Sequence, residues 1–229
     1  MHYGYYETYF LLVLPAILIS LIAQWKVKST YARYSEYRTQ SGMTGAQIAR
    51  RILDENGLQY VGIESISGEL TDHYDPNEQV VRLSRGVYYG NSVAALGVAA
   101  HETGHAVQDA QGYVPLRIRI AIIPATNLGA KLSMPILFLG LIAGIDALVT
   151  LGILLFSLMT VFQLVTLPVE FNASRRALYT LSQGVLTGEE LDGTRHVLTA
   201  AALTYVAALL VSAMQLLRLV LLYGNRRRR

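Results

Sequence analysis

The 229-residue chain contains no cysteine, which excludes disulfide bonds and thiolate metal ligands, so any bound metal must be held by His, Asp or Glu. Charge is also scarce: charged residues make up 15% of the chain, hydrophobic residues make up 52%, and the mean hydropathy is +0.35. The net charge is only +3, and the basic residues cluster beside apolar segments without interleaved aromatic residues. This pattern indicates a protein whose partner is a lipid bilayer and argues against nucleic acid as a partner.

The first long apolar segment, Tyr9 to Trp25, contains no charged residue and is about long enough to cross a bilayer. Aromatic residues at its ends suit the membrane interface, so we expect a transmembrane helix over residues 9–25. The flank before it lacks the lysine or arginine of a signal peptide, and Lys26 and Lys28 stand where a small-residue cleavage site would be. We therefore expect this helix to remain in the mature protein.

A second uncharged stretch of spanning length, Ala147 to Leu167, follows an apolar stretch from about residue 121 to residue 144. A turn at residues 144–146 would join the two, which predicts a transmembrane helical hairpin over residues 121–167. Lys131 lies in the first leg, from which its long side chain can reach the surface.

A last apolar segment covers residues 197–223, carries Gln215 and Arg218, and is predicted to be a C-terminal transmembrane helix. It is followed by the run Arg226 to Arg229. Between the hairpin and this segment, residues 168–196 form a more polar region that we expect to be helical.

Membrane orientation follows from the positive charges. Lysine and arginine follow the first apolar segment and are absent before it, so the positive-inside rule places residues 26–119 in the cytoplasm. The hairpin then returns Glu170 to the same side. Four crossings would leave the terminal arginine run outside, against the rule. Two alternatives stay open: the last segment does not span as a simple helix, or the early charges dominate.

Residues 26–119 form the only sizeable polar region, and we expect a small α+β lobe there. Residues 44–56 combine one apolar face with a threonine cap at the start and Gly57 at the end, which predicts a short amphipathic helix. Ser92 is placed to cap a longer helix over about residues 93–111.

Strands are expected between these two helices. Residues 60–66 and 79–83 are rich in β-branched side chains, which favours strands. The turn sequence Asp-Pro-Asn at residues 75–77 joins the second of these to residues 70–74. The sequence therefore predicts a small hairpin or sheet.

The longer helix contains the sequence HETGH. His101 and His105 are four residues apart, so they lie one turn from each other and both imidazoles can reach one ion. Glu102 is offset by one residue, near the ion without having to ligate it. This is the HExxH arrangement, in which two histidines bind zinc and the glutamate moves a proton from zinc-bound water to the leaving amine. We expect Gly104 to give room beside the ion. The alternative is a helix whose histidines make structural hydrogen bonds.

A catalytic zinc needs a third protein ligand and an open position for water. With no cysteine, and only His2, His73 and His196 left among the histidines, a carboxylate is favoured. Glu170 directly follows the second span, where a carboxylate at the membrane edge is costly without a partner. The alternative roles for this residue are a salt bridge to Arg175 or a charge at a helix N-terminus.

Three stretches, HETGH, EFNASRRA and LTDHYDPNEQVVRLS, resemble the YugP-like neutral zinc metallopeptidases, a family of bacterial integral membrane proteins. The resemblance extends over most of the chain. More distantly, HExxH followed by ExxA is similar to the HtpX and CAAX-prenyl protease group, whose glutamate is the third ligand. The resemblance implies one zinc ion, with His101, His105 and Glu170 as ligands and Glu102 as general base. It also implies a multi-pass protein of the bacterial cell membrane.

One position departs from the pattern of these relatives. In thermolysin-like and HtpX-like enzymes an aspartate four residues after the third ligand steadies a ligand imidazole, and this chain has Ser174 there. A serine is a shorter, uncharged partner. Asp109, four residues after His105 on the same helical face, is a candidate substitute, and the alternative is a solvated surface residue.

Peptide hydrolysis also needs a group that stabilises the oxyanion. The candidates are His196, Arg175, Tyr113 and His73, and no spacing rule selects among them. His73 lies in a predicted strand, and an edge strand beside the active helix can pair with extended substrate. Its alternative is a surface turn residue, and that of His196 is a plain interfacial histidine.

Together these observations predict a mainly α membrane protein with transmembrane helices and a small α+β, zincin-like metalloprotease lobe. The leading functional hypothesis is a zinc endopeptidase with its active site at the cytoplasmic membrane face, acting on membrane or membrane-proximal proteins. The alternative is a non-catalytic membrane metal-binding or scaffold protein. A purely structural site has no need of Glu102 and is usually closed by a fourth protein ligand. An ion transporter is disfavoured because its ionisable residues should lie within the spans.

Overall fold

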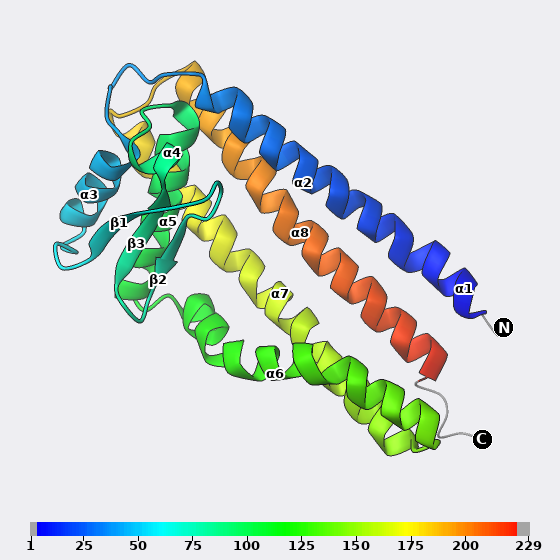
Figure 1. Ribbon diagram of the computed structural model, residues 1–229. Helices are drawn as coiled ribbons and strands as arrows, with labels where there is room; N and C mark the ends of the chain where they lie inside the picture. The colour runs from blue at the N-terminus through cyan, green and yellow to red at the C-terminus, as the bar shows by residue number, and fades with distance from the viewer. Residues whose placement is uncertain (1–3, 224–229) are drawn as a thin grey trace. The chain divides into compact units, whose positions relative to one another are not determined.

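The computed structural model describes residues 4–223, so the predictions that involve His2 and the terminal arginine run lie outside the described residues. Helices dominate the fold (Figure 1). The described chain divides into two compact units. We call them the membrane unit, which comprises the chain up to Gln24, Ile118–Leu167 and the chain from Thr204 on, and the lobe unit, which comprises Trp25–Arg117 and Pro168–Leu203.

Four helical segments are long and apolar enough to cross a membrane, namely Tyr6–Ser35, Val114–Ala143, Asp146–Ser182 and Glu189–Tyr223. The last three are helices α6, α7 and α8. The first covers most of α1 (Tyr5–Thr8), together with a π-helical turn η1 (Tyr9–Val13) and α2 (Leu14–Ser35). With the small sheet described below, these segments confirm the predicted mainly α membrane protein with an α+β lobe.

The helices extend beyond the apolar stretches that predict them. Helix α2 continues past Trp25 to Ser35, because low hydropathy ends the apolar stretch without ending the backbone hydrogen bonding of a helix. Helix α7 contains Pro168 and continues to Ser182, so the region expected to be helical at residues 168–196 is divided between the end of α7 and the start of α8. Proline is tolerated inside membrane helices, where neighbouring groups satisfy the freed carbonyl.

Helix α8 begins at Glu189, eight residues before the predicted start at Val197. Its first turn carries Glu189, Glu190 and Asp192, and negative charge stabilises the positive end of the helix dipole. Hydropathy alone does not include this acidic turn, because it marks only the apolar part of the helix.

In the membrane unit, helices α6 and α7 form a hairpin whose turn falls at residues 144–145. Gly144 adopts φ +68°, a left-handed conformation that glycine reaches without a steric penalty. Leu137, Phe156 and Leu219 form the buried centre of this unit, and they bring α6, α7 and α8 together.

The lobe unit contains a three-stranded sheet of β1 (Gly62–Ile66), β2 (His73–Asp75) and β3 (Val80–Ser84) in the order β1-β3-β2. Strand β1 runs parallel to β3 and β2 runs antiparallel to it, so β2 is an edge strand. The Asp75 carboxylate closes the β2–β3 turn by accepting hydrogen bonds from the backbone N–H groups of Asn77 and Glu78, at 2.9 and 3.2 Å.

Helices α3 (Gly45–Glu55), α4 (Arg85–Tyr88) and α5 (Val93–Ala110) complete this part of the lobe unit. Hydroxyl groups cap the two longer ones, since Thr44 accepts from the N–H of Gln47 and Ser92 accepts from the N–H of Ala95. Helix α5 lies beside the sheet (Figure 1), and its apolar side chains form the core of the lobe with those of α3 and β3. The HETGH sequence lies on α5, so it is held by a helix that packs in the core of the lobe unit.

Candidate metal centre

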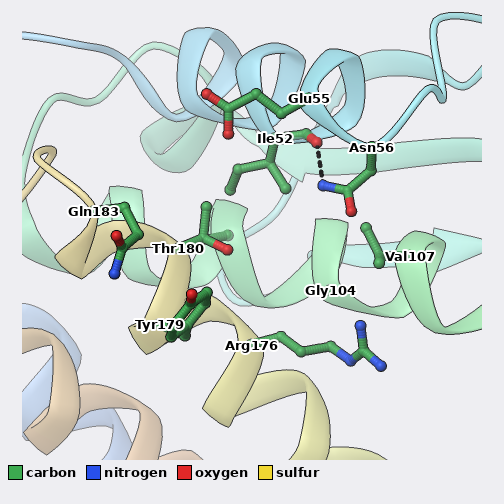
Figure 2. A pocket seen from close by; sticks show the side chains of 10 residues that line it. Ile52, Glu55, Asn56, Gly104, Val107, Arg176, Tyr179, Thr180 and Gln183 are labelled. Atoms are coloured by element: carbon green, nitrogen blue, oxygen red, sulfur yellow. Dashed lines mark hydrogen bonds between the residues drawn. The ribbon is translucent and has the colours of Figure 1, made fainter.

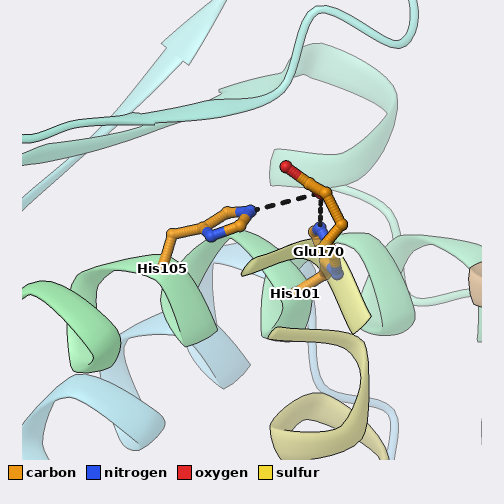
Figure 3. A group of neighbouring side chains, drawn as sticks. All are labelled: His101, His105 and Glu170. Carbon is orange, nitrogen blue, oxygen red and sulfur yellow. Dashed lines mark hydrogen bonds and ion pairs between the residues drawn. The ribbon is translucent and has the colours of Figure 1, made fainter. Parts of the chain in front are cut away.

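Three side chains from two helices meet in the lobe unit. His101 and His105 project from α5 and Glu170 projects from α7, 65 residues further along the chain (Figure 3). One oxygen of Glu170, Oε2, lies 3.2 Å from Nε2 of His101 and 3.6 Å from Nε2 of His105. The ligand atoms of the three residues all lie within 4.8 Å of one another. Two imidazole nitrogens and a carboxylate oxygen thus converge on one small volume.

The group is buried, with exposed fractions of 9% for His101, 8% for His105 and 2% for Glu170. A carboxylate in such a place is costly unless positive charge compensates it. Burial lowers the pKa of His105, but the hydrogen bond and the charge of Glu170 outweigh that effect, so the net shift of the pKa is upward. The carboxylate therefore makes this volume favourable for a cation.

The spacing of the three residues fits zinc. Two N or O ligands about 2.1 Å from a tetrahedrally coordinated zinc ion lie about 3.4 Å from each other. The separations of Glu170 Oε2 from the two histidine nitrogens, 3.2 and 3.6 Å, bracket that value. Within residues 4–223 this is the only cluster of three or more His, Asp or Glu side chains close enough to share an ion. The donor set and its spacing both suit a site with three protein ligands.

Glu102 follows His101 on α5 and is half-buried, outside the cluster of three. Burial raises the pKa of its carboxyl above the usual range. The adjacent histidines oppose this shift, and the charges of Glu170 and Asp72 add to it. A carboxylate with a raised pKa is a better proton acceptor than an ordinary surface carboxylate.

Ser174, four residues after Glu170, contacts a candidate ligand although a serine is shorter than the aspartate of the related enzymes. Its Oγ lies 3.1 Å from Nδ1 of His101. This contact and the one from Glu170 both come from α7, so one turn of that helix reaches both ring nitrogens of His101.

Asp109 does not contact His105, and this part of the sequence interpretation is corrected. Its carboxylate instead accepts a hydrogen bond from the Tyr74 hydroxyl on β2, at 3.0 Å. Burial and this hydrogen bond both raise the pKa of Tyr74. Asp109 therefore fastens the edge strand to α5, because rotation along the helix turns it from the imidazole toward the sheet.

Gln108 takes the place expected for Asp109, and the sequence reasoning missed it. Its Oε1 lies 3.0 Å from Nδ1 of His105, and its side chain is fully buried. The sequence pattern could have identified Gln108. On a helix, the residues three and four positions after His105 both lie on its face, so Gln108 was as good a candidate as Asp109. Which of Gln108 and Asp109 faces His105 depends on where α7 packs against α5.

Gly104 also has a different role from the one expected. It does not open space beside the three ligand candidates but lies against α7, where an added Cβ would come 3.1 Å from the backbone oxygen of Ala173. Its missing side chain lets α5 and α7 approach closely, and this approach brings Glu170 to the histidines.

The four oxyanion candidates occupy different places. His73 is exposed on β2, with Nδ1 2.8 Å from the Thr71 carbonyl oxygen. His196 stacks on Tyr34, with Nδ1 3.0 Å from the tyrosine hydroxyl. The remaining two are Arg175, which is exposed on α7, and Tyr113, whose hydroxyl lies 3.4 Å from the Pro168 carbonyl oxygen. None of these contacts involves the cluster of three.

A pocket between α3, α5 and α7 lies close to the cluster but contains none of its three residues (Figure 2). Gly104 and Val107 line it from α5, and Arg176 lines it from α7. The guanidinium of Arg176 donates from Nε to Oδ1 of Asn172, at 2.7 Å. The concentration of ionisable ligands, and not this pocket, marks the candidate site.

Fold and site together define a helical membrane protein with a candidate zinc centre of two histidines and a glutamate in its α+β lobe. The chain belongs to the family described as "Putative neutral zinc metallopeptidase", which matches residues 9–224. It is 51% identical over 218 residues to the "Putative membrane protease YugP" of Bacillus subtilis, covering 94% of this chain and 96% of that protein. The resemblance to the YugP-like neutral zinc metallopeptidases is thereby confirmed. No solved structure is significantly similar.

Proposed function

We propose that this protein is a membrane-embedded zinc endopeptidase of the gluzincin type, in which the HExxH histidines His101 and His105 and the carboxylate of Glu170 hold one zinc ion. The observation that carries the proposal is the buried meeting of these three side chains, with ligand atoms within 4.8 Å of one another. Three protein ligands leave a fourth tetrahedral position open, which is typical of catalytic and not of structural zinc sites.

A bound zinc ion would supply Lewis acidity, which activates water and polarises the scissile carbonyl. Glu102 would act as the general base, since its position next to His101 holds its carboxylate beside the ligands without making it one of them. It would accept a proton from the attacking water and deliver a proton to the leaving amine.

The scaffold alternative requires a fourth protein ligand that closes the site. His73 and His196 were the candidates for it, and Nδ1 of each is occupied elsewhere, by the Thr71 carbonyl and the Tyr34 hydroxyl. Neither belongs to the cluster that could share an ion. These contacts favour an open, catalytic site.

Substrates would be membrane or membrane-proximal proteins, reached from the cytoplasmic side. Two observations support this. Glu170 comes three residues after the uncharged stretch Ala147 to Leu167 on the same helix, and the positive charges after the first span favour a cytoplasmic lobe.

Strand β2 would bind the substrate backbone. It is an edge strand, held to α5 through Tyr74, and an extended peptide can pair with such a strand.

The decisive experiment is Glu102→Gln in the full chain, purified in detergent and loaded with zinc. Zinc should remain bound at one equivalent, and cleavage of fluorescein-labelled casein should fall by about 10²- to 10⁴-fold, the usual contribution of a general base. Glu189→Gln makes the same chemical change at an exposed carboxylate and should leave both zinc content and cleavage unchanged.

Undiminished cleavage by zinc-loaded Glu102→Gln would overturn the assignment of the base. A wild-type protein that holds zinc but cleaves nothing, with a spectroscopically closed shell of four protein ligands, would favour the scaffold alternative.

A further inference from the structure

Gln108 connects the candidate centre to the neighbouring helix through three hydrogen bonds. Its Oε1 faces Nδ1 of His105 at 3.0 Å, and its Nε2 faces the Val169 carbonyl oxygen and Oδ1 of Asn172, both at 2.9 Å. The side chain has no exposed surface. A buried carboxamide with this many partners has a fixed orientation.

The orientation can be deduced from one end of the chain of contacts. Nε of Arg176 can only donate, so the atom of Asn172 that lies 2.7 Å from it must be the amide oxygen. The same oxygen faces Gln108, so the facing atom of Gln108 must be its NH2 group. The Val169 carbonyl, which can only accept, leads independently to the same result.

The remaining atom of Gln108, its carbonyl oxygen, then faces His105 and can only accept. Nδ1 of His105 must therefore carry a proton, so Nε2, on the side of Glu170, is the nitrogen left to bind a metal. This is the tautomer that a metal-binding Nε2 needs. His101 differs, because the Ser174 hydroxyl at its Nδ1 can donate or accept and does not by itself select a tautomer.

We propose that Gln108 is the positioning residue of the zinc site, and that Val169 and the Asn172–Arg176 pair hold its carboxamide so that His105 presents Nε2 as a ligand. This role rests on the proposed zinc site, within which it assigns a function to a residue that never touches the ion or the substrate. It also gives Arg176, at the edge of the pocket in Figure 2, an indirect connection to the centre.

The main variant is Gln108→Leu, which keeps most of the volume and removes all three hydrogen bonds. The zinc dissociation constant of the detergent-purified full chain, measured by competition with a chelating dye, should rise about 10- to 100-fold, as for other residues that orient a metal ligand. In the zinc-free protein labelled with ¹⁵N-histidine, the His105 signal should shift from the Nδ1–H toward the Nε2–H tautomer.

Thr103→Val is the matched control. Thr103 is also a fully buried polar residue of α5, but its hydroxyl bonds only carbonyl groups of its own helix, those of Ala99 and Ala100. This variant should keep the zinc affinity and the His105 tautomer. A purely structural role for Gln108 predicts the opposite, namely that both variants lower thermal stability and neither changes the tautomer.

Two changes at Asn172 test the proposal independently if Gln108→Leu does not fold. Asn172→Asp keeps an oxygen that accepts from both Gln108 and Arg176, so zinc affinity and tautomer should be preserved. Asn172→Leu removes that acceptor and should weaken zinc binding, by less than Gln108→Leu because Val169 remains.

Unchanged zinc affinity and tautomer in both Gln108→Leu and Asn172→Leu would overturn the positioning role. His105→Ala separates this failure from failure of the site itself. If His105→Ala binds zinc as tightly as the wild type, the zinc site is wrong and both proposals fall. If it loses zinc and Gln108→Leu does not, only the positioning role is wrong.

Discussion

Ser174 lies one helical turn after Glu170 on α7, and its hydroxyl oxygen is 3.1 Å from Nδ1 of His101, while Glu170 is 3.2 Å from Nε2 of the same ring. The imidazole is thus held between two side chains of a single helix. A hydroxyl is uncharged, so it holds the ring less strongly than the carboxylate found at this position in thermolysin-like and HtpX-like enzymes.

Changing Ser174 should therefore change zinc affinity in both directions. Ser174→Ala removes the partner of Nδ1, and we expect the zinc dissociation constant to rise about 10-fold. Ser174→Asp supplies a charge-assisted acceptor and should lower it below the wild-type value. Ser182→Ala is the control, because that exposed hydroxyl contacts only the Tyr179 carbonyl and the neighbouring Gln183 amide, away from the ligand candidates. Equal dissociation constants for Ser174→Ala and wild type would show that the contact does not orient His101.

Gly104→Ala should displace Glu170 through the contact between α5 and α7. The new Cβ would lie 3.1 Å from the Ala173 carbonyl oxygen, so α7 must move by a few tenths of an ångström and carry Glu170 with it. We expect a loss of about 1–3 kcal/mol in stability, as for other small-to-large changes at close contacts, together with weaker zinc binding.

Gly97→Ala makes the same change on the same helix but meets Thr194 on α8, with a Cβ to Cγ2 distance of 2.9 Å. It should lower the thermal unfolding temperature and leave the zinc dissociation constant unchanged. If the two variants weaken zinc binding equally, the approach of α5 to α7 does not position Glu170.

These contacts show which parts of the site the sequence can predict. The caps at Thr44 and Ser92 and the spacing of His101 and His105 are local, because each depends on residues within one helical turn. Glu170 could be predicted although it is distant in sequence from the histidines. A charged carboxylate at the end of an apolar stretch is energetically costly, and that cost indicates a partner.

The contacts that orient the ligands were harder to predict. Gln108 and Asp109 are adjacent, and the difference between facing His105 and facing Tyr74 is one residue's rotation about α5. That rotation is set by the packing of α7 and β2 against α5, which depends on residues distant in sequence. The role of Gly104 has the same origin, since its neighbour Ala173 lies 69 positions away.

The β2–β3 turn should weaken in acid. Hydrogen bonds from the N–H groups of Glu78 and Asn77, and the ion pair with Arg82, lower the pKa of Asp75 below its usual value. A carboxyl whose pKa is lower in the folded than in the unfolded chain stabilises the fold above its unfolded pKa of about 3.9, and this contribution is lost as the pH falls through the folded value. Amide hydrogen exchange at the turn, corrected for the intrinsic rate, should accelerate over that range.

Asp75→Asn tests the origin of this effect. Its side-chain oxygen can still accept the two turn hydrogen bonds, but it does not titrate. Arg82 also pairs with Glu64 and Glu78, so the informative quantity is the difference between the wild-type and variant profiles. Identical pH profiles would mean that Asp75 does not contribute.

Zinc should stabilise the folded protein through Glu170. The carboxylate is 2% exposed, and burying its charge is costly until a cation shares the site. Ligand bound only by the folded state adds about 2.7 kcal/mol at a free concentration 100 times the dissociation constant, so a chelator should lower the unfolding temperature and added zinc should restore it. Magnesium should not substitute for zinc, because it prefers a shell of oxygen ligands to imidazole.

Glu170→Gln keeps the shape of the side chain and removes the charge, so the unfolding temperature of this variant should no longer respond to zinc. A zinc-dependent rise as large as that of the wild type would place the stabilising metal elsewhere in the protein.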